Sequence, residues 1–180
     1  MGFAREPGRC HNDPLTLATE SGLAMGVSTL DQVIKKAEEH CNHPGAKLTP
    51  KRKNILILLL RSGSPLSAYE LAERYQQQFH ESVPPMSVYR MLDFLMTENL
   101  AHKLVSENKF IACSHIACNH QHQVPQFLIC DHCNKVKEIA IGKEIIDALN
   151  INVTKAGYHL INHQLELHCL CDECSQTSAA

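Results

Sequence analysis

The sequence predicts an α+β fold divided between two small domains. Stretches with the helical spacing of apolar residues precede two short β-like stretches, whereas the second half follows a β-β-α-β pattern. A Cys-x-x-Cys pair lies near each end of that second pattern. The chain has 180 residues, which suffice for one medium domain or two small ones, and its 44 % hydrophobic residues allow burial.

Ordered structure is expected to begin with a helix after Ser28, where apolar residues recur at helical spacing. In the next helix, Thr49 can act as N-cap, Pro50 suits the first helical position and Gly63 can end the helix. Its apolar run ILILLL at 55–60 is much shorter than the ~20 residues of a membrane span, so a buried helix is expected there.

Ser67 and Glu70 form the pattern of a capping box, which predicts the start of a third helix. A fourth helix is expected at about 86–98, and short strands at 101–105 and 109–113. This order is typical of a winged helix-turn-helix, in which the second helix of the core pair enters the major groove of DNA. A generic small α+β domain fits the helix order alone equally well.

In the second half, strands are expected at 126–130 and 135–141, a helix over 143–157, and a strand over 159–170. Three apolar side chains of that helix are expected to point inward: Ile145, Ile146 and Leu149. Such a unit offers one buried sheet face and would be unstable alone. We therefore expect it to dimerise and to be stabilised by metal.

The net charge of −2 gives no support for nucleic-acid binding by itself. Residues 25–112 carry eleven Lys and Arg against nine Asp and Glu, and residues 113–180 carry four against seven, so only the first part is mildly basic. A field this weak requires individual basic residues to be well placed. No secretory signal is visible at 1–28, which predicts a cytoplasmic protein without a membrane segment.

Thiols stay reduced in the cytoplasm, so clustered cysteines there favour metal binding over disulfides. Four of them, Cys130, Cys133, Cys171 and Cys174, form two Cys-x-x-Cys pairs. Two such turns can complete a tetrahedral S4 site, which suits Zn²⁺. A closed shell leaves no open coordination position, so this zinc would stabilise the fold. A pair of redox dithiols is the alternative.

A second set of donors is concentrated around the expected domain junction. His102 and Cys113 fall on the expected hairpin strands, Glu138 follows the first Cys-x-x-Cys pair, and the linker between the domains holds further candidates: His115, Cys118, His120 and His122. A second zinc site joining hairpin, linker and C-terminal sheet would couple metal occupancy to the angle between the domains. Polar linker residues without metal are the alternative.

An enzyme is not expected, since neither of two zinc-enzyme motifs, H-E-x-x-H and H-x-E…P-C-x-x-C, is present.

Several segments between 28 and 174 together resemble the ferric uptake regulator family, and most closely its zinc uptake regulator branch. They are LTPKR at 48–52, SAYEL at 67–71, SVYRMLDFL at 87–95, AHK at 101–103, FLICDHCNKVKE at 127–138 and HCLCDEC at 168–174. The resemblance implies a dimeric, metal-dependent transcriptional regulator with an N-terminal winged helix-turn-helix domain and a small α/β dimerisation domain with structural zinc. The expected organisation is a disordered extension at 1–27, the DNA-binding domain at 28–113, a metal-ligating linker at 114–125, the dimerisation domain at 126–175 and a disordered tail at 176–180.

The resemblance also implies about two Zn²⁺ per subunit. The four cysteines would hold the structural ion, and the regulatory ion would be held by His102, Cys113, Glu138 and a linker histidine, His122 or, failing that, His120. A thiolate at Cys113 favours zinc over the iron preferred by sites of histidine and carboxylate. An iron- or peroxide-responsive regulator is the nearest alternative.

The expected partners are a second copy of the chain and double-stranded DNA with a palindromic operator. Tyr89 and Arg90 lie near the start of the expected recognition helix, where side chains reach base edges. Contacts to phosphates are expected from five further residues: Lys51, Arg52, Ser87, Lys103 and Lys109. Zinc would act as corepressor of zinc uptake genes by locking the dimer in a DNA-competent conformation. No small-molecule substrate is expected.

Overall fold

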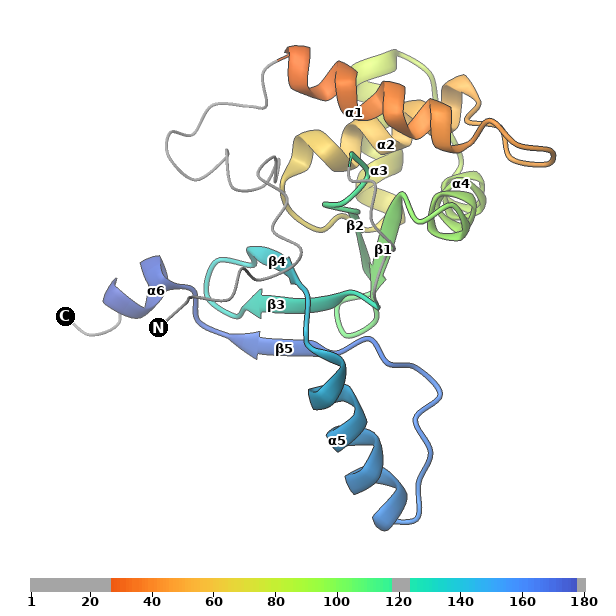
Figure 1. Cartoon of the computed structure of the whole chain (residues 1–180). Helices are drawn as coiled ribbons and strands as arrows, with labels where there is room; N and C mark the ends of the chain where they lie inside the picture. Colours follow the sequence, from red (N-terminus) through yellow and green to blue (C-terminus); the bar gives the residue numbers. More distant parts are fainter. Residues whose placement is uncertain (1–26, 118–123, 178–180) are drawn as a thin grey trace, which may run out of the picture. The chain divides into compact units, whose positions relative to one another are not determined.

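The computed structural model describes residues 27–117 and 124–177 (Figure 1). The chain divides into two compact units, the first ending at His120 and the second beginning at Gln121. Most of the predicted disordered extension, 1–27, and three residues of the predicted disordered tail, 176–180, lie outside the described residues. The remaining residues of both segments are helical: Val27 begins the first helix, and the last described helix runs to Thr177. Within the described parts, no helix has the length and apolar character needed to cross a membrane.

The first unit places helices before a hairpin, in the order expected. Its elements are α1 (Val27–His40), α2 (Pro50–Ser62), α3 (Ala68–Phe79), α4 (Pro85–Thr97), β1 (Ala101–Leu104) and β2 (Lys109–Ala112). Helix α2 is central, because it packs against α1, α3, α4 and β2. Its apolar run is accordingly buried on most sides, at Ile55, Leu56, Leu58, Leu59 and Leu60.

The predicted helix boundaries of the first unit are confirmed to within a residue or two. Pro50 begins α2 after an extended Thr49, and Gly63 ends it with a φ of 60°, a left-handed value that glycine adopts without strain. The capping box of α3 is complete: the Glu70 N–H donates to Ser67 Oγ at 3.2 Å, and the Ser67 N–H donates to Glu70 Oε2 at 2.7 Å. These bonds with Ser67 lower the pKa of Glu70.

The hairpin is extended by a bridge to the segment before α3. Strands β1 and β2 pair antiparallel from Ala101 opposite Ala112 to Leu104 opposite Lys109. Leu66 and Phe110 exchange two backbone hydrogen bonds, of 2.9 and 2.8 Å, so this segment lies beside β2 as a third short strand. The helices followed by this hairpin confirm the predicted winged helix-turn-helix architecture.

The second unit is built on a three-stranded sheet of order β4-β3-β5. It contains β3 (Gln126–Cys130), β4 (Val136–Ile139), α5 (Lys143–Lys155), β5 (Glu166–Cys169) and α6 (Asp172–Thr177). The central strand β3 pairs antiparallel with β4 and parallel with β5. Phe127 and Ile129 of β3 are buried. The α+β architecture of the whole chain is therefore as predicted, although the short helix α6 was not anticipated.

Two predictions for the second unit were wrong. The strand expected over 159–170 covers only Glu166–Cys169, because the Gln126 side chain replaces ladder bonds before it: Gln126 Nε2 donates to His163 O, and the Leu165 N–H donates to Gln126 Oε1. Ile145 was expected to point inward, but its side chain is 59 % exposed, and α5 has no buried residue. Within this unit α5 projects away from the sheet, so little surface is available to cover its apolar face (Figure 1).

Candidate metal centres

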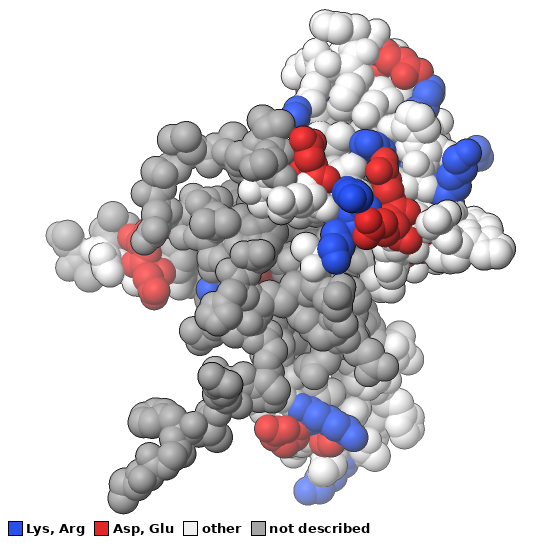
Figure 2. Space-filling view, turned by 45° about the horizontal axis from the view of Figure 1, so that its top comes forward, with Lys and Arg blue, Asp and Glu red and all other residues white. Residues whose placement is uncertain are grey.

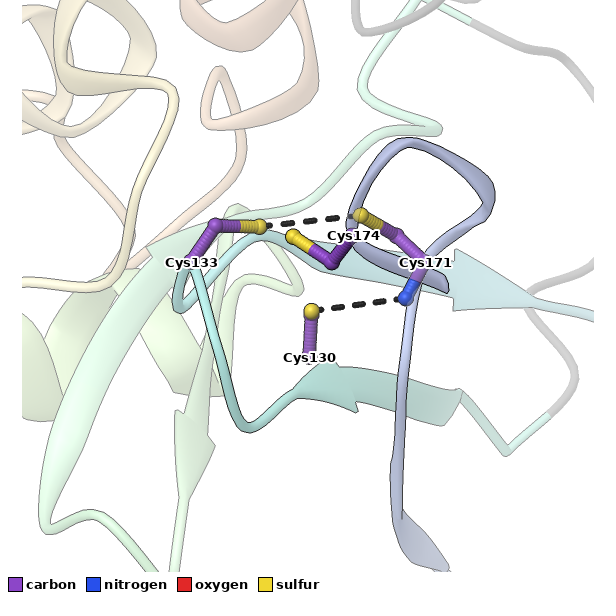
Figure 3. A group of neighbouring side chains, drawn as sticks. All are labelled: Cys130, Cys133, Cys171 and Cys174. Carbon is purple, nitrogen blue, oxygen red and sulfur yellow. Dashed lines mark hydrogen bonds between the residues drawn. The ribbon is translucent and has the colours of Figure 1, made fainter. Parts of the chain in front are cut away.

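The sheet of the second unit brings the two Cys-x-x-Cys pairs together. Cys130 is the last residue of β3, opposite Cys169 at the end of β5, and Cys171 follows two residues later. Parallel neighbours end at the same edge of a sheet, so the turns that follow them meet. The four cysteines Cys130, Cys133, Cys171 and Cys174 accordingly converge, the first two from the end of β3 and its turn, and the last two from the segment after β5 and the start of α6 (Figure 3).

The spacing of these four sulfurs fits a tetrahedral zinc site. All four Sγ atoms lie within 4.8 Å of one another. The Cys133 and Cys171 sulfurs are 3.7 Å apart. Zn–S bonds of about 2.3 Å in a tetrahedron place sulfurs about 3.8 Å apart, so the thiols need little movement to share one ion. The predicted S4 cluster therefore exists in the fold.

Backbone amides and mutual crowding give these thiols opposite acidities. The Cys171 N–H donates to the Cys130 sulfur at 3.3 Å, and this bond, with a further one from Cys133, lowers the pKa of Cys130 to about 6. The pKa of Cys174 is raised to about 12, first by its hydrogen bond with Cys171 and then by burial. Four acids this close resist ionising together, and a dication relieves that repulsion.

The turn after β3 is shaped by Asn134, which has a left-handed φ of 56°. Its N–H donates to Cys130 O at 2.8 Å, which closes the loop that carries the first pair of thiols. Lys135 and Glu173 then form an ion pair between the two cysteine turns. Both side chains are more than half exposed, so this pair adds little to stability.

A second pair of metal donors lies on the hairpin of the first unit. His102 of β1 is opposite Ile111, and the Cys113 N–H donates to Leu100 O at 3.0 Å. Since side chains alternate along strands, this register puts His102 and Cys113 on one face as diagonal neighbours. A ring nitrogen of His102 and the Cys113 sulfur lie within 4.8 Å. Both groups are shielded, since the His102 Nε2 atom and Cys113 are buried.

The other predicted ligands belong to the second unit or to the linker. Glu138 lies on β4 opposite Phe127 and is half-buried. Cys118, His120 and His122 lie outside the described residues. Cys169, which had no predicted role, donates its thiol to Ile129 O at 3.6 Å and is not one of the four converging sulfurs.

The residues predicted to meet DNA bases lie in the first turns of α4. Arg90 is exposed, whereas Tyr89 is half-buried with its ring edge-on to Phe110, the centroids 6.2 Å apart. Two large exposed side chains were missed by the sequence analysis: Tyr69, 67 % exposed, and Met86, 68 % exposed, in the first turns of α3 and α4. Their positions outside the buried stripe of each helix could have identified them.

Among the predicted phosphate contacts, Ser87 lies in the first turn of α4 and is half-buried. Lys51 forms an exposed ion pair with Glu81, which raises the pKa of Lys51. The Lys103 ammonium group is 5.8 Å from the centre of the Phe110 ring. Lys109 begins β2 and is half-buried.

The model of the ferric uptake regulator family matches residues 43–168 of this chain. The chain belongs to this family. It is therefore a metal-responsive transcriptional regulator and not an enzyme, which confirms the resemblance inferred from the motifs. The matched residues include parts of both units.

Similar proteins of this family include regulators of zinc and of iron uptake. The zinc uptake regulation protein of Escherichia coli (strain K12) is 32 % identical over 155 residues, which cover 86 % of this chain and 88 % of that protein. The ferric uptake regulation protein of Helicobacter pylori is 30 % identical over 151 residues, which cover 84 % of this chain and 97 % of that protein.

Two solved structures resemble the fold closely. A zinc uptake regulator complexed with zinc and DNA has a TM-score of 0.73 at 29 % identity, covering 84 % of this chain and 99 % of that chain. The crystal structure of holo XcZur has a TM-score of 0.65 at 36 % identity, and the match covers 79 % of this chain and 96 % of that chain.

Proposed function

We propose that this protein is a zinc-responsive, DNA-binding repressor of zinc uptake genes that acts in the cytoplasm, with zinc as corepressor. The observation that carries the proposal is the buried Cys113 thiol beside His102 on the hairpin of a family member. A thiolate with imidazole favours zinc over the harder ions that carboxylate-rich sites select. Similarity to zinc uptake regulators, one of them bound to zinc and DNA, supports the same function.

The S4 cluster would hold a structural zinc ion in each subunit. The second unit, which contains the cluster, has few buried apolar side chains, and small domains of this kind are commonly stabilised by metal. The apolar side chains exposed along α5 and the segment after it would be covered by a second copy of the chain. A two-fold dimer of winged helices would bind a palindromic operator.

The regulatory ion would be held by His102 and Cys113 of the hairpin, Glu138 of β4 and a linker histidine, His122 or His120. When bound, zinc supplies a four-coordinate cross-link between these ligands. His102 and Cys113 present a nitrogen and a sulfur from one unit, and Glu138 presents a carboxylate from the other. Holding both units at one ion restricts the motion of the winged helix, so the DNA-competent fraction of dimers rises and the apparent affinity for DNA rises with it.

Recognition of the operator would rest on α4. Arg90 can donate two hydrogen bonds to a guanine edge, which discriminates by roughly 1–3 kcal/mol, and Tyr89 can contact a thymine methyl group or a phosphate. Ser87, Lys51, Lys103 and Lys109 would contact phosphates. Figure 2 shows Lys and Arg interspersed with Asp and Glu among the described residues of the face in view. Recognition would therefore depend more on single well-placed basic residues than on a broad positive field.

The first test is operator affinity at fixed salt as a function of buffered free zinc, with a promoter fragment of a zinc import gene. Wild type is expected to bind more tightly as free zinc rises. Cys113→Ser should keep its fold and its structural zinc but lose the zinc response, since the buried thiolate is replaced by a weak ligand. Binding promoted only by Fe²⁺ or Mn²⁺ would instead favour the iron- or peroxide-responsive alternative. Equal binding by both proteins at all zinc levels would contradict a sensor at Cys113.

A further inference from the structure

Arg52, in the first turn of α2, has its side chain engaged by other parts of the protein. Its guanidinium carbon lies 3.7 Å from the centre of the Phe94 ring on α4. Its Nη1 atom donates to Lys47 O at 2.7 Å. One planar face and one N–H of the guanidinium group therefore serve contacts within the first unit, between the loop before α2 and the recognition helix.

Phe94 occupies a particular position on that helix. Arg90, Phe94 and Glu98 follow one another at intervals of four residues, so their side chains share one side of α4 and its C-terminal cap. The Glu98 carboxylate accepts a hydrogen bond from His43 Nε2 at 3.0 Å, and His43 lies in the loop before α2. Two members of this row are thus held in place, Phe94 by Arg52 of the first turn of α2 and Glu98 by His43 of the loop before α2, while Arg90 remains exposed.

The neighbours of Arg52 behave differently. Lys51 and Lys53 are directed to Glu81 and Glu38, in ion pairs whose side chains are 38–55 % exposed. Such exposed pairs exchange readily with a phosphate, because they are weak in water. A guanidinium group stacked on an aromatic ring and bonded to a carbonyl has a fixed plane, and lysine cannot reproduce it.

We infer that Arg52 is a positioning residue for DNA recognition: by stacking on Phe94 it fixes the rotation of α4 and thereby the direction of Arg90. This inference rests on the proposed DNA-binding function and replaces the phosphate contact that the sequence suggested for Arg52. In this inference, the loop at 41–48 and the start of α2 contribute to operator specificity without contacting DNA.

The test is a salt titration of operator binding by the zinc-loaded, full-length protein. Arg52→Gln, Arg52→Lys and Phe94→Leu are each expected to weaken binding by about tenfold, a loss within the range of a cation–π contact. The slope of log affinity against log salt should stay at the wild-type value in all three, because no phosphate contact is lost. The double variant Arg52→Gln/Phe94→Leu should be no weaker than the single ones, since both remove one interaction.

Lys109→Gln is the matched control, because loss of a phosphate contact should lower the salt slope by about 0.9. The inference is overturned if Arg52→Gln lowers the slope by that amount, if Arg52→Lys binds like wild type, or if the two single losses add. Thermal unfolding of each variant is measured in parallel. If Arg52→Gln destabilises the first unit, Phe94→Leu still tests the inference, because it removes the aromatic ring but keeps an apolar side chain at this position. The titration of the wild-type protein alone tests the proposed function, which fails if wild type shows no zinc-dependent binding to the operator. The variants test only the inference about Arg52.

Discussion

At the scale of single residues, burial alone does not make a cysteine a metal ligand. Cys41 and Cys130 are both buried, yet their acidities are opposite. Backbone N–H donors lower the pKa of Cys130 to about 6. The pKa of Cys41 is raised to about 11 by burial and, second, by the nearby Glu98 carboxylate, against a smaller opposing effect of Arg52. Donors aimed at the sulfur, and other thiols beside it, distinguish the candidate metal ligand Cys130 from the core residue Cys41.

Cys41 should therefore make the stability of the first unit sensitive to alkaline pH. Its folded pKa of about 11 lies above the value of 9.0 for an exposed thiol, so above pH 9 the unfolded chain loses this proton before the folded chain does. The free energy of unfolding should then fall as the pH rises from about 9 through about 11. Urea unfolding at pH 8 and pH 10.5 measures this fall in the free energy of unfolding. Cys41→Val should lose less stability than wild type between these two pH values. An equal loss in both proteins would contradict the effect of the thiol.

At the scale of elements, a single buried amide determines where β5 begins. Gln126 is 1 % exposed, and its Nε2 atom donates to His163 O at 2.9 Å and to Val124 O at 3.1 Å. Its Oε1 atom accepts from the Leu165 N–H. The side chain thus satisfies backbone groups just before the parallel pairing of β3 with β5, and that pairing sets the register that brings the cysteine turns together.

Replacing this amide should weaken both the sheet and the S4 cluster. In Gln126→Leu, the Leu165 N–H and the His163 carbonyl lose their partner, at a cost of roughly 1–3 kcal/mol for each buried group. Unfolding in urea and zinc retention against a chelator are the measurements. Gln78→Leu, which changes an exposed glutamine of α3, serves as control and should match wild type. Unchanged zinc retention in Gln126→Leu would show that the register is set elsewhere.

At the scale of the whole molecule, the second unit leaves a group of large apolar side chains exposed. Several large apolar side chains of this unit are well exposed: Ile145, Ile151, Tyr158, Ile161, Leu167 and Leu170. In solution such a surface favours association, because burying it removes apolar area from water. The proposed dimer would cover this surface.

Ile145→Glu should therefore shift the zinc-loaded protein from dimer to monomer. The substitution puts a charge into the surface proposed to be covered, where burial without a partner is costly. Size-exclusion chromatography with light scattering gives the mass directly. Lys143→Glu alters charge on the same helix at an already charged position and should leave the dimer intact. A dimeric Ile145→Glu protein would place the subunit contact on a different face.

The local signals in the sequence determined most elements of this protein. Capping residues such as Ser67 with Glu70, the proline at the start of α2 and the glycine after it act through neighbouring backbone, so their effects can be predicted from spacing alone. The same holds for the two Cys-x-x-Cys turns, whose chemistry already indicated a shared ion.

Only the tertiary structure decided what depends on contacts between distant segments. The start of β5 was mispredicted because the Gln126 amide, 37 residues from His163, takes the place of strand pairing. The inward direction of Ile145 was mispredicted because helical periodicity marks an apolar face but cannot say whether the same chain covers it. The stacking of Arg52 on Phe94 has no local signal at all, since these residues are 42 positions apart and lie on two helices that must pack against each other.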